Sequence, residues 1–230
     1  MFLKEINYIT TYATYMESLE PGGIVGSSFA NAGEMLKPMR SQQYEVGIKA
    51  EVRGLLLTAA LFQIDKSNNF RDQNNRQTQD GRQVHNGLEL SVQGRLFEDL
   101  TLYGGYTYLD PQIKKANNSA LNGKEPVGIS HHIFKMYAEY DIPFLEGLTL
   151  TGGVYYMGST YRNYDNTERM PGYTTADLGA RYTTDYFGFD TTFRLNVTNI
   201  TNEKYWIIDP LESIHISQPR TLSFSATVSF

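Results

Sequence analysis

The chain has 230 residues and no cysteine, which excludes disulfide scaffolds, thiolate zinc sites and cysteine nucleophiles. Its 20 Lys and Arg residues against 25 Asp and Glu residues give a formal net charge of −5. This is the wrong sign for a protein that binds the nucleic-acid backbone, so no nucleic-acid partner is expected. Because no apolar run reaches the roughly 18 residues that a membrane helix needs, helical membrane spans are excluded as well.

Alternation of apolar and polar residues predicts ten β-strands and essentially no helix. The alternation is clearest near the end of the chain, where Leu222, Phe224 and Val228 share one parity and serines and threonines share the other. We therefore expect an all-β, antiparallel, up-and-down fold over residues 1–230. The expected strands cover residues 4–17, 41–52, 55–67, 82–96, 100–112, 129–142, 147–160, 172–184, 189–200 and 219–230.

The connections between these strands alternate between short and long. Short turns are expected at 52–54, 97–99, 142–147 and 185–188, and long polar loops at 18–40, 68–81, 113–128, 161–171 and 201–218. A transmembrane β-barrel of the bacterial outer membrane keeps short turns on the periplasmic side and long loops outside the cell. Many of the predicted strands have about 10–13 residues, enough for a tilted bilayer crossing and longer than the ~5–6 residues typical of soluble strands. The pattern therefore predicts a transmembrane β-barrel segment.

The two faces of the predicted strands differ in charge. The uncharged parity is expected to face lipid, and the charged parity is expected to line a wet lumen with cross-strand ion pairs. Aromatic residues near strand ends suit the interfacial belt of a membrane protein. The lumenal charges are Glu89, Arg95, Lys135, Glu139, Asp177, Arg181 and Arg194, and the expected belt residues are Tyr103, Tyr106, Tyr108, Tyr155, Tyr156, Tyr173, Tyr182 and Phe187.

Four stretches of the chain, in order, resemble the barrel of TonB-dependent receptors for ferric siderophores. They are residues 41–50 (SQQYEVGIKA), 57–66 (LTAALFQIDK), 87–94 (GLELSVQG) and 194–205 (RLNVTNITNEKY), and the tail from Gln218 to Phe230 fits the last strand of that family. The resemblance implies a ligand-gated importer in the outer membrane. Such a barrel has about 22 strands and is closed by a plug. An inner-membrane complex energises it through a segment called the TonB box.

A complete barrel of this kind would need far more residues than are present. At about 23 residues per strand and connection, 22 strands require roughly 500 residues. We therefore expect this chain to be the C-terminal barrel portion, without the plug and the N-terminal barrel strands. The resemblance implies as partners a ferric siderophore, the receptor's own plug domain, the TonB complex through the missing N-terminal part, and outer-membrane lipid and lipopolysaccharide. A ten-stranded passive pore or adhesin and a soluble all-β interaction protein remain alternatives.

Catalysis and metal binding are not expected. The chain has four histidines and no Gly-x-Ser-x-Gly elbow, which gives no basis for a hydrolase. Adjacent His131 and His132 lie on opposite faces of a strand, so they cannot chelate one metal together and are expected to make hydrogen bonds at the rim. No cofactor is expected either, since the cargo iron of such a receptor arrives fully chelated.

The receptor resemblance implies that aromatic faces and hydrogen-bond donors in the extracellular loops contact the cargo. The candidates are Tyr161, Arg162, Tyr164, Tyr205, Trp206 and His215, with Arg71 and Arg76 as further donors. The tyrosines and the tryptophan could equally be interface anchors. Haem is an alternative cargo, for which His215 is the candidate axial ligand, although the Phe-Arg-Ala-Pro and Asn-Pro-Asn-Leu strings usual in haem receptors do not occur.

Overall fold

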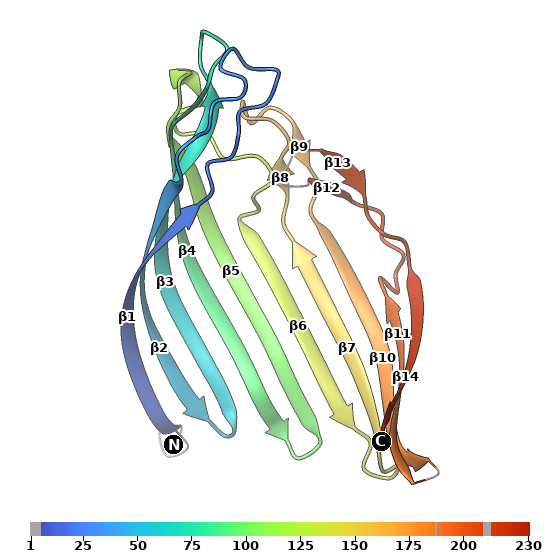
Figure 1. Ribbon diagram of the computed structural model, residues 1–230. Helices are drawn as coiled ribbons and strands as arrows, with labels where there is room; N and C mark the ends of the chain where they lie inside the picture. The colour runs from blue at the N-terminus through green and yellow to red at the C-terminus, as the bar shows by residue number, and fades with distance from the viewer. Residues whose placement is uncertain (1–5, 187, 209–212) are drawn as a thin grey trace.

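The computed structural model describes residues 6–186, 188–208 and 213–230. Ten long strands form one antiparallel sheet in the order β1-β2-β3-β4-β5-β6-β7-β10-β11-β14 (Figure 1). Their bounds are β1 Ile6–Glu20, β2 Met39–Val52, β3 Leu55–Arg71, β4 Gln77–Phe97, β5 Leu100–Lys115, β6 His132–Asp141, β7 Leu148–Met157, β10 Tyr173–Tyr186, β11 Phe189–Thr198 and β14 Thr221–Ser229. Within the described residues, no helix is long and apolar enough to cross a membrane.

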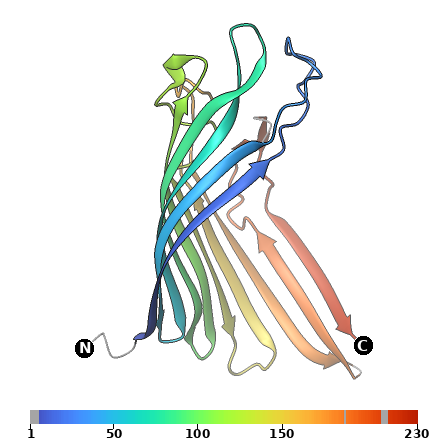
Figure 2. The same ribbon diagram turned by 60° about the vertical axis from the view of Figure 1, so that its left-hand side comes forward.

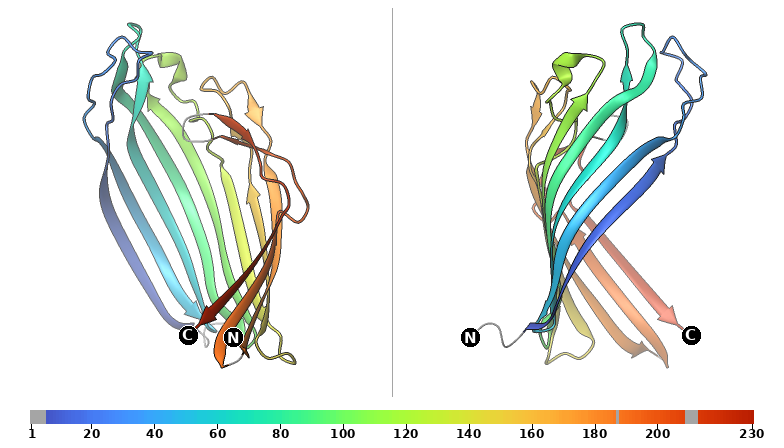
Figure 3. Two further views of the ribbon diagram at one scale, coloured as in Figure 1. Left: turned by 45° about the vertical axis from the view of Figure 1, so that its right-hand side comes forward. Right: turned by 90° about the vertical axis from the view of Figure 1, so that its left-hand side faces the viewer.

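The sheet curves into an open wall with its two edges apart, as Figures 2 and 3 show. All short turns lie at one end of the wall and all long connections at the other. The turn between β2 and β3 shows why the short ones are tight. Arg53 (φ 50°) and Gly54 (φ 79°) both have positive φ, the backbone of a two-residue type I′ turn whose twist suits flanking strands. The predicted ten-stranded, up-and-down topology is confirmed.

One face of the sheet carries a continuous apolar band. The strand register places Val46, Leu61 and Leu88 side by side on adjacent strands. In the same way Leu178, Val197 and Leu222 form a row near the other edge. Val46 and Leu61 are 55% and 59% exposed. Such a band would be unfavourable in water but suits the hydrocarbon of a bilayer, so this face is the outer wall.

The opposite face carries the charges predicted for the lumen, whereas the ion pairs Arg40–Glu17 and Arg82–Asp65 have the parity of the apolar band. The Arg181 guanidinium pairs with the Glu139 carboxylate at 2.9 Å, and Lys66 Nζ lies 3.6 Å from Glu20. Arg181 also stands directly opposite Arg194 in the register of β10 and β11. The charged parity is therefore a polar wall, with the ion pairs Arg181–Glu139 and Lys66–Glu20 crossing between strands.

The expected aromatic belt is wrong for three of its residues, which face the lumen instead. Tyr155 pairs in register with Lys135, and Tyr103 lies near Tyr137 with ring centroids 6.3 Å apart. These tyrosines therefore share the charged, lumenal face, and so does Tyr173, because parity along a strand decides the face. Tyr106, Tyr108, Tyr156 and Tyr182 have the outward parity. The expected belt residue Phe187 lies outside the described residues.

The predicted loop at 68–81 is also wrong, because β3 and β4 continue through most of it. Ser67 pairs with Arg82 and Arg71 with Gln77, with one irregularity after Asn68. The polar sequence resembles a loop because this hairpin stands above the apolar band, where both faces meet water. Smaller elements lie in the other long connections, namely the 3₁₀ turn Ser119–Leu121 and the pairs β8 (Thr160–Tyr161) with β9 (Arg169–Met170) and β12 (Trp206–Ile208) with β13 (Ile214–Ile216).

Candidate functional site

The tall β3–β4 hairpin joins the connections on either side of it. Asn31, between β1 and β2, bonds the backbone of Gln77 twice, since its Oδ1 accepts from Gln77 N at 2.9 Å and its Nδ2 donates to Gln77 O at 3.1 Å. From the other side, Asn117 Nδ2 donates to Thr78 Oγ1 at 2.9 Å. The hairpin is therefore held by hydrogen bonds to two extracellular connections.

The β5–β6 connection also contacts the next two connections along the chain. Gly128 N donates to Tyr161 O at 2.9 Å. Asn166 holds the backbone of Glu125, accepting from its N at 2.8 Å and donating to its O at 3.0 Å. A Cβ added at Gly128 would lie 3.6 Å from the Ile208 side chain, so the β11–β14 connection packs here too. All five long connections thus form one linked rim.

The candidate residues of the β7–β10 connection sit on a compact turn. Asn163 Oδ1 accepts from the backbone N of Thr167 and of Glu168, each at 3.1 Å. This turn brings Arg162 against Glu168, and the two form an ion pair. Arg162 is therefore already neutralised by its own loop, which weakens its predicted role as a charge partner for cargo.

The aromatic candidates of the same connection have different neighbours. The Arg169 guanidinium lies over the Tyr161 ring, 5.4 Å from its centroid. Tyr164 meets Phe70 edge to face, with centroids 6.1 Å apart, so an aromatic contact joins the β7–β10 connection to the tall hairpin. Both further donors are engaged as well. Their contacts are Arg71 over the Phe29 ring at 5.0 Å and Arg76 with Glu34 at 2.9 Å.

The remaining candidates lie in the β11–β14 connection. Tyr205 stacks flat on Tyr173, with centroids 3.6 Å apart and planes 13° from parallel, so it fixes the loop base. Trp206 is 52% exposed and pairs in register with exposed Ile216. His215 is exposed and pairs in register with Ile207. Trp206 and His215 therefore both lie on the exposed pair of short strands β12 and β13.

Asn199 organises the base of that loop and was not among the predicted site residues. It has φ of 50° and is 7% exposed. Its Oδ1 accepts from Glu203 N at 2.8 Å, and its Nδ2 donates to Glu203 O at 2.9 Å and to Gln218 O at 3.2 Å. An Asn that follows a strand and precedes a long loop is a usable signal, because Asn tolerates positive φ and bonds nearby backbone.

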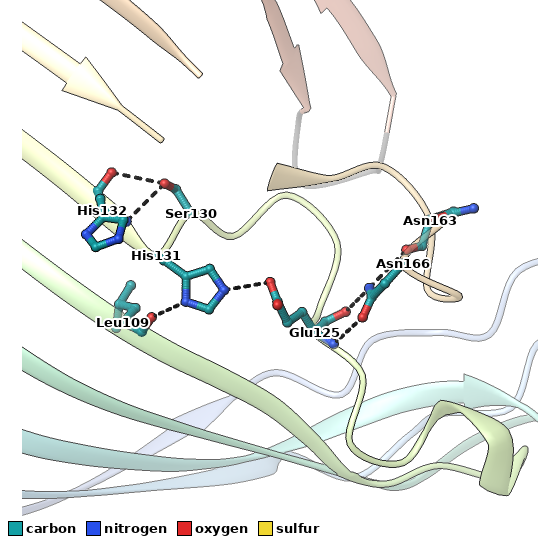
Figure 4. A network of polar contacts seen from close by, with 7 residues as sticks. All are labelled: Leu109, Glu125, Ser130, His131, His132, Asn163 and Asn166. Carbon is teal, nitrogen blue, oxygen red and sulfur yellow. Dashed lines mark hydrogen bonds and ion pairs between the residues drawn. The ribbon is translucent and has the colours of Figure 1, made fainter. Parts of the chain in front are cut away.

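The paired histidines also make contacts that the sequence only partly predicted. His131 Nδ1 lies 2.7 Å from Leu109 O, and its Nε2 lies 2.9 Å from a Glu125 carboxylate oxygen, as Figure 4 shows. His132 instead bonds Tyr106 Oη through Nδ1 at 2.8 Å. The expectation of rim hydrogen bonds is confirmed. The expected placement on opposite faces of a strand is wrong, because β6 begins at His132 and both rings lie beside Tyr108. The link from His131 through Glu125 to Asn166 could not be foreseen, because Glu125 and Asn166 are 41 residues apart.

The side chains of this rim can contact a ligand and surround it. Aromatic faces, amides and paired arginines can hold a bulky ligand without bonding its metal. Within residues 6–186, 188–208 and 213–230, no group of three or more His, Asp or Glu side chains is placed to hold a metal ion.

The chain matches a known protein family and is similar to known receptors. Residues 5–200 match the family described as TonB dependent receptor-like, beta-barrel. The chain is 35% identical to the ferrichrome receptor FcuA of Yersinia enterocolitica, over all of this chain and 31% of that protein. It is 30% identical to the ferrichrome outer membrane transporter/phage receptor of Escherichia coli K12, over 86% of this chain and 27% of that protein.

A solved receptor structure has the same fold. The crystal structure of BauA, the ferric preacinetobactin receptor from Acinetobacter baumannii, superposes with a TM-score of 0.83 at 34% identity, covering 97% of this chain and 34% of that one. The chain therefore spans about a third of the length of the proteins it matches.

Proposed function

Because the chain belongs to the β-barrel family of TonB-dependent receptors, we propose that it supplies the C-terminal strands and extracellular loops of a receptor that imports a ferric siderophore. The family consists of outer-membrane transport receptors, so no enzymatic activity is proposed. The observation that carries the proposal is the linked rim of five extracellular connections, which bears exposed Trp206 above a charged lumenal wall. The receptor's plug and the TonB complex would gate and energise transport.

The arginines of the rim already contact carboxylates or aromatic rings of this chain, which favours a neutral chelate as cargo. Arg162 and Arg76 are paired with Glu168 and Glu34. Arg71 and Arg169 lie over aromatic rings. A ferric trihydroxamate is neutral because three singly charged hydroxamates balance Fe³⁺, whereas a ferric tris-catecholate carries three negative charges and needs free cations around it. Two of the relatives are named for ferrichrome and ferrioxamine B, which supports a siderophore cargo.

The test is a Trp206→Ala substitution in the complete receptor, followed by equilibrium binding of a ferric trihydroxamate and uptake of its radioactive iron. We expect binding to weaken about tenfold, because the aromatic face buries apolar area against the ligand. Phe144→Ala is the matched control, since Phe144 is 90% exposed in a turn at the opposite end of the barrel. Barrel assembly should be normal in both variants.

The same assay separates the alternatives for cargo and function. If the receptor takes up haem and loses that uptake in His215→Ala, and if siderophore binding is unaffected by Trp206→Ala, the cargo is haem and not a siderophore. Solute flux that needs neither ligand nor the TonB complex would support a passive pore instead. The siderophore proposal stands only if binding falls in Trp206→Ala and is unchanged in Phe144→Ala.

A further inference from the structure

Above the apolar band, the outer face of β1 to β5 carries polar residues in ordered rows; β1 and β2 run in front in Figure 2. The row next to Leu61 and Leu88 contains tyrosines and amides. Its members, each opposite the next in the strand register, are Tyr15, Tyr44, Gln63 and Asn86. The two tyrosine rings have centroids 5.1 Å apart. Because tyrosines gather at membrane interfaces, the hydrocarbon of the outer leaflet ends near this row.

A row that carries three cations lies farther from the band. It consists of Arg40, Ser67, Arg82 and Lys115, on β2, β3, β4 and β5. Ser67 Oγ lies 3.5 Å from Arg40 O, and the register pairs Ser67 with Arg82 and Arg82 with Lys115. Lys114 adds another cation to this face, since its Nζ donates to Gln112 Oε1 and Gln112 has the outward parity. Four cations are thus gathered on the lipid-facing side of the barrel.

Two carboxylates stand one row nearer the band and turn the arginines toward the membrane. Arg40 forms an ion pair with Glu17, and Arg82 Nε lies 2.9 Å from both carboxylate oxygens of Asp65. A third carboxylate, Asp110, lies farther down, in the row of tyrosines and amides. Both arginine side chains remain 56% exposed. A guanidinium has more N–H groups than one carboxylate engages, so each arginine keeps donors for another acceptor.

The height of the cations above the band selects the kind of lipid. Four residues of a strand that rises ~3.4 Å per residue at a tilt of ~40° span ~10 Å of membrane thickness. Asp65 lies four residues beyond Leu61 on β3, and the guanidinium groups are level with it. The head-group layer of a phospholipid leaflet is only ~5–7 Å thick. A phospholipid phosphate therefore lies below the cations, whereas a phosphorylated sugar head group extends to them.

The rows between the band and the cations suit sugar hydroxyls. Gln63 Nε2 donates to Asn86 Oδ1 at 2.7 Å, and Gln42 Nε2 donates to the Tyr15 hydroxyl at 3.2 Å. A side-chain amide has two N–H donors and a carbonyl acceptor, so these groups can bond each other and a sugar at the same time. Apolar residues, uncharged hydrogen-bonding groups and cations thus follow one another up this face.

We propose that the outer face of β1 to β5 binds a phosphorylated glycolipid of the outer leaflet. Its phosphates contact Arg40, Arg82, Lys114 and Lys115, its sugars contact the amides below them, and its acyl chains lie on the apolar band. Arginine and phosphate form strong, charge-assisted hydrogen bonds. The inference rests on the location of the barrel in the outer membrane and does not depend on the cargo.

The test measures glycolipid binding to the complete receptor in detergent by native mass spectrometry. The probes are lipid A, a diphosphorylated glycolipid, and the same glycolipid without phosphates. We expect wild-type receptor to bind the phosphorylated form more tightly. Replacing all four cations by glutamine should weaken its binding by more than about tenfold, since each cation near a membrane surface adds attraction to anionic lipid. Binding of the phosphate-free form should not change.

The matched control is Lys66→Gln. Lys66 stands between Asp65 and Ser67 in the chain, but it pairs with Glu20 on the lumenal face. Glycolipid binding should therefore be that of the wild type. If the variant without the four cations does not assemble, Glu17→Gln combined with Asp65→Asn keeps the cations and removes their carboxylates. This variant should bind the phosphorylated form about threefold more tightly or better, because less negative charge then faces the phosphates.

Inorganic phosphate in large excess is added as a competitor. It should not displace the glycolipid, because a free ion contacts neither the amides nor the apolar band. Displacement would make this a site for free phosphate and would overturn the lipid assignment. The inference is also overturned by equal binding of the two glycolipid forms, by an equal loss in Lys66→Gln, or by weaker binding once Glu17 and Asp65 are neutralised.

Discussion

At the scale of single residues, asparagines shape the extracellular rim. Asn75, Asn166, Asn199 and Asn202 all have positive φ, between 50° and 58°. Asn is among the few residues that adopt this conformation at low cost, and its short amide bonds backbone groups nearby. Asn199 lies within the stretch 194–205 that resembles siderophore receptors. The structure gives a physical reason for an Asn there, because its side chain closes the base of the loop that carries Trp206.

Replacing Asn199 should loosen that loop without unfolding the barrel. Asn199→Ala removes three side-chain hydrogen bonds to Glu203 and Gln218 and places a Cβ-bearing residue with no compensating bond at positive φ. We expect a local loss of about 1–3 kcal/mol, measured as faster amide exchange over 200–208. Asn199→Gly separates the two effects, since glycine accepts the backbone conformation. Among the contacts of the described residues, Asn202→Gly loses one side-chain bond, to Arg220 N, and should change exchange less; equal effects in the two glycine variants would contradict this role.

At the scale of elements, parity decides what each strand tolerates. In β14, Phe224 stands opposite Leu195 and stacks near Phe193, with centroids 6.3 Å apart on the apolar face. Ser225 stands opposite Arg194, which itself stands opposite Arg181. Adjacent positions of one strand therefore meet lipid and a cationic wall in turn.

Phe224→Arg should impair membrane assembly far more than Thr227→Arg. A charge on the lipid face near the bilayer midplane costs about 2–4 kcal/mol, whereas the lumenal face is wet. Thr227 is the suitable lumenal control because it stands opposite Thr192. Ser225 is not, since an arginine there would be placed beside Arg194 and would add repulsion of its own. Folding yields in lipid vesicles, measured by gel mobility without heating, should rank wild type and Thr227→Arg above Phe224→Arg; equal yields for the two variants would refute the face assignment.

At the scale of the whole molecule, the sheet has two open edges. Within the part of the chain that the structure describes, β1 pairs only with β2 and β14 pairs only with β11. Unpaired backbone groups are costly in hydrocarbon, where no water replaces the missing partner. The wall thus needs further strands to close around a lumen.

Expressed alone, this chain should not form a stable closed pore. We expect it to aggregate or be degraded in the outer membrane, because both edges offer unpaired strands to other chains. Two measurements check this: unboiled gels, which would reveal a heat-modifiable monomer, and planar bilayers, which would reveal ion conductance. Both appearing together would show that ten strands can close by themselves and would support the passive-pore alternative.

The sequence by itself determined the number, order and direction of the strands, because a period of two along each strand and the alternation of turn lengths are local properties. It also identified the family, through four short stretches in order. The tertiary structure decided what depends on contacts between distant residues. It showed that the 68–81 segment is a hairpin, that Arg162 is neutralised by Glu168, and that Tyr205 packs on Tyr173. It alone joined His131, Glu125 and Asn166, since the pairing of two loops leaves no periodic trace in either of them.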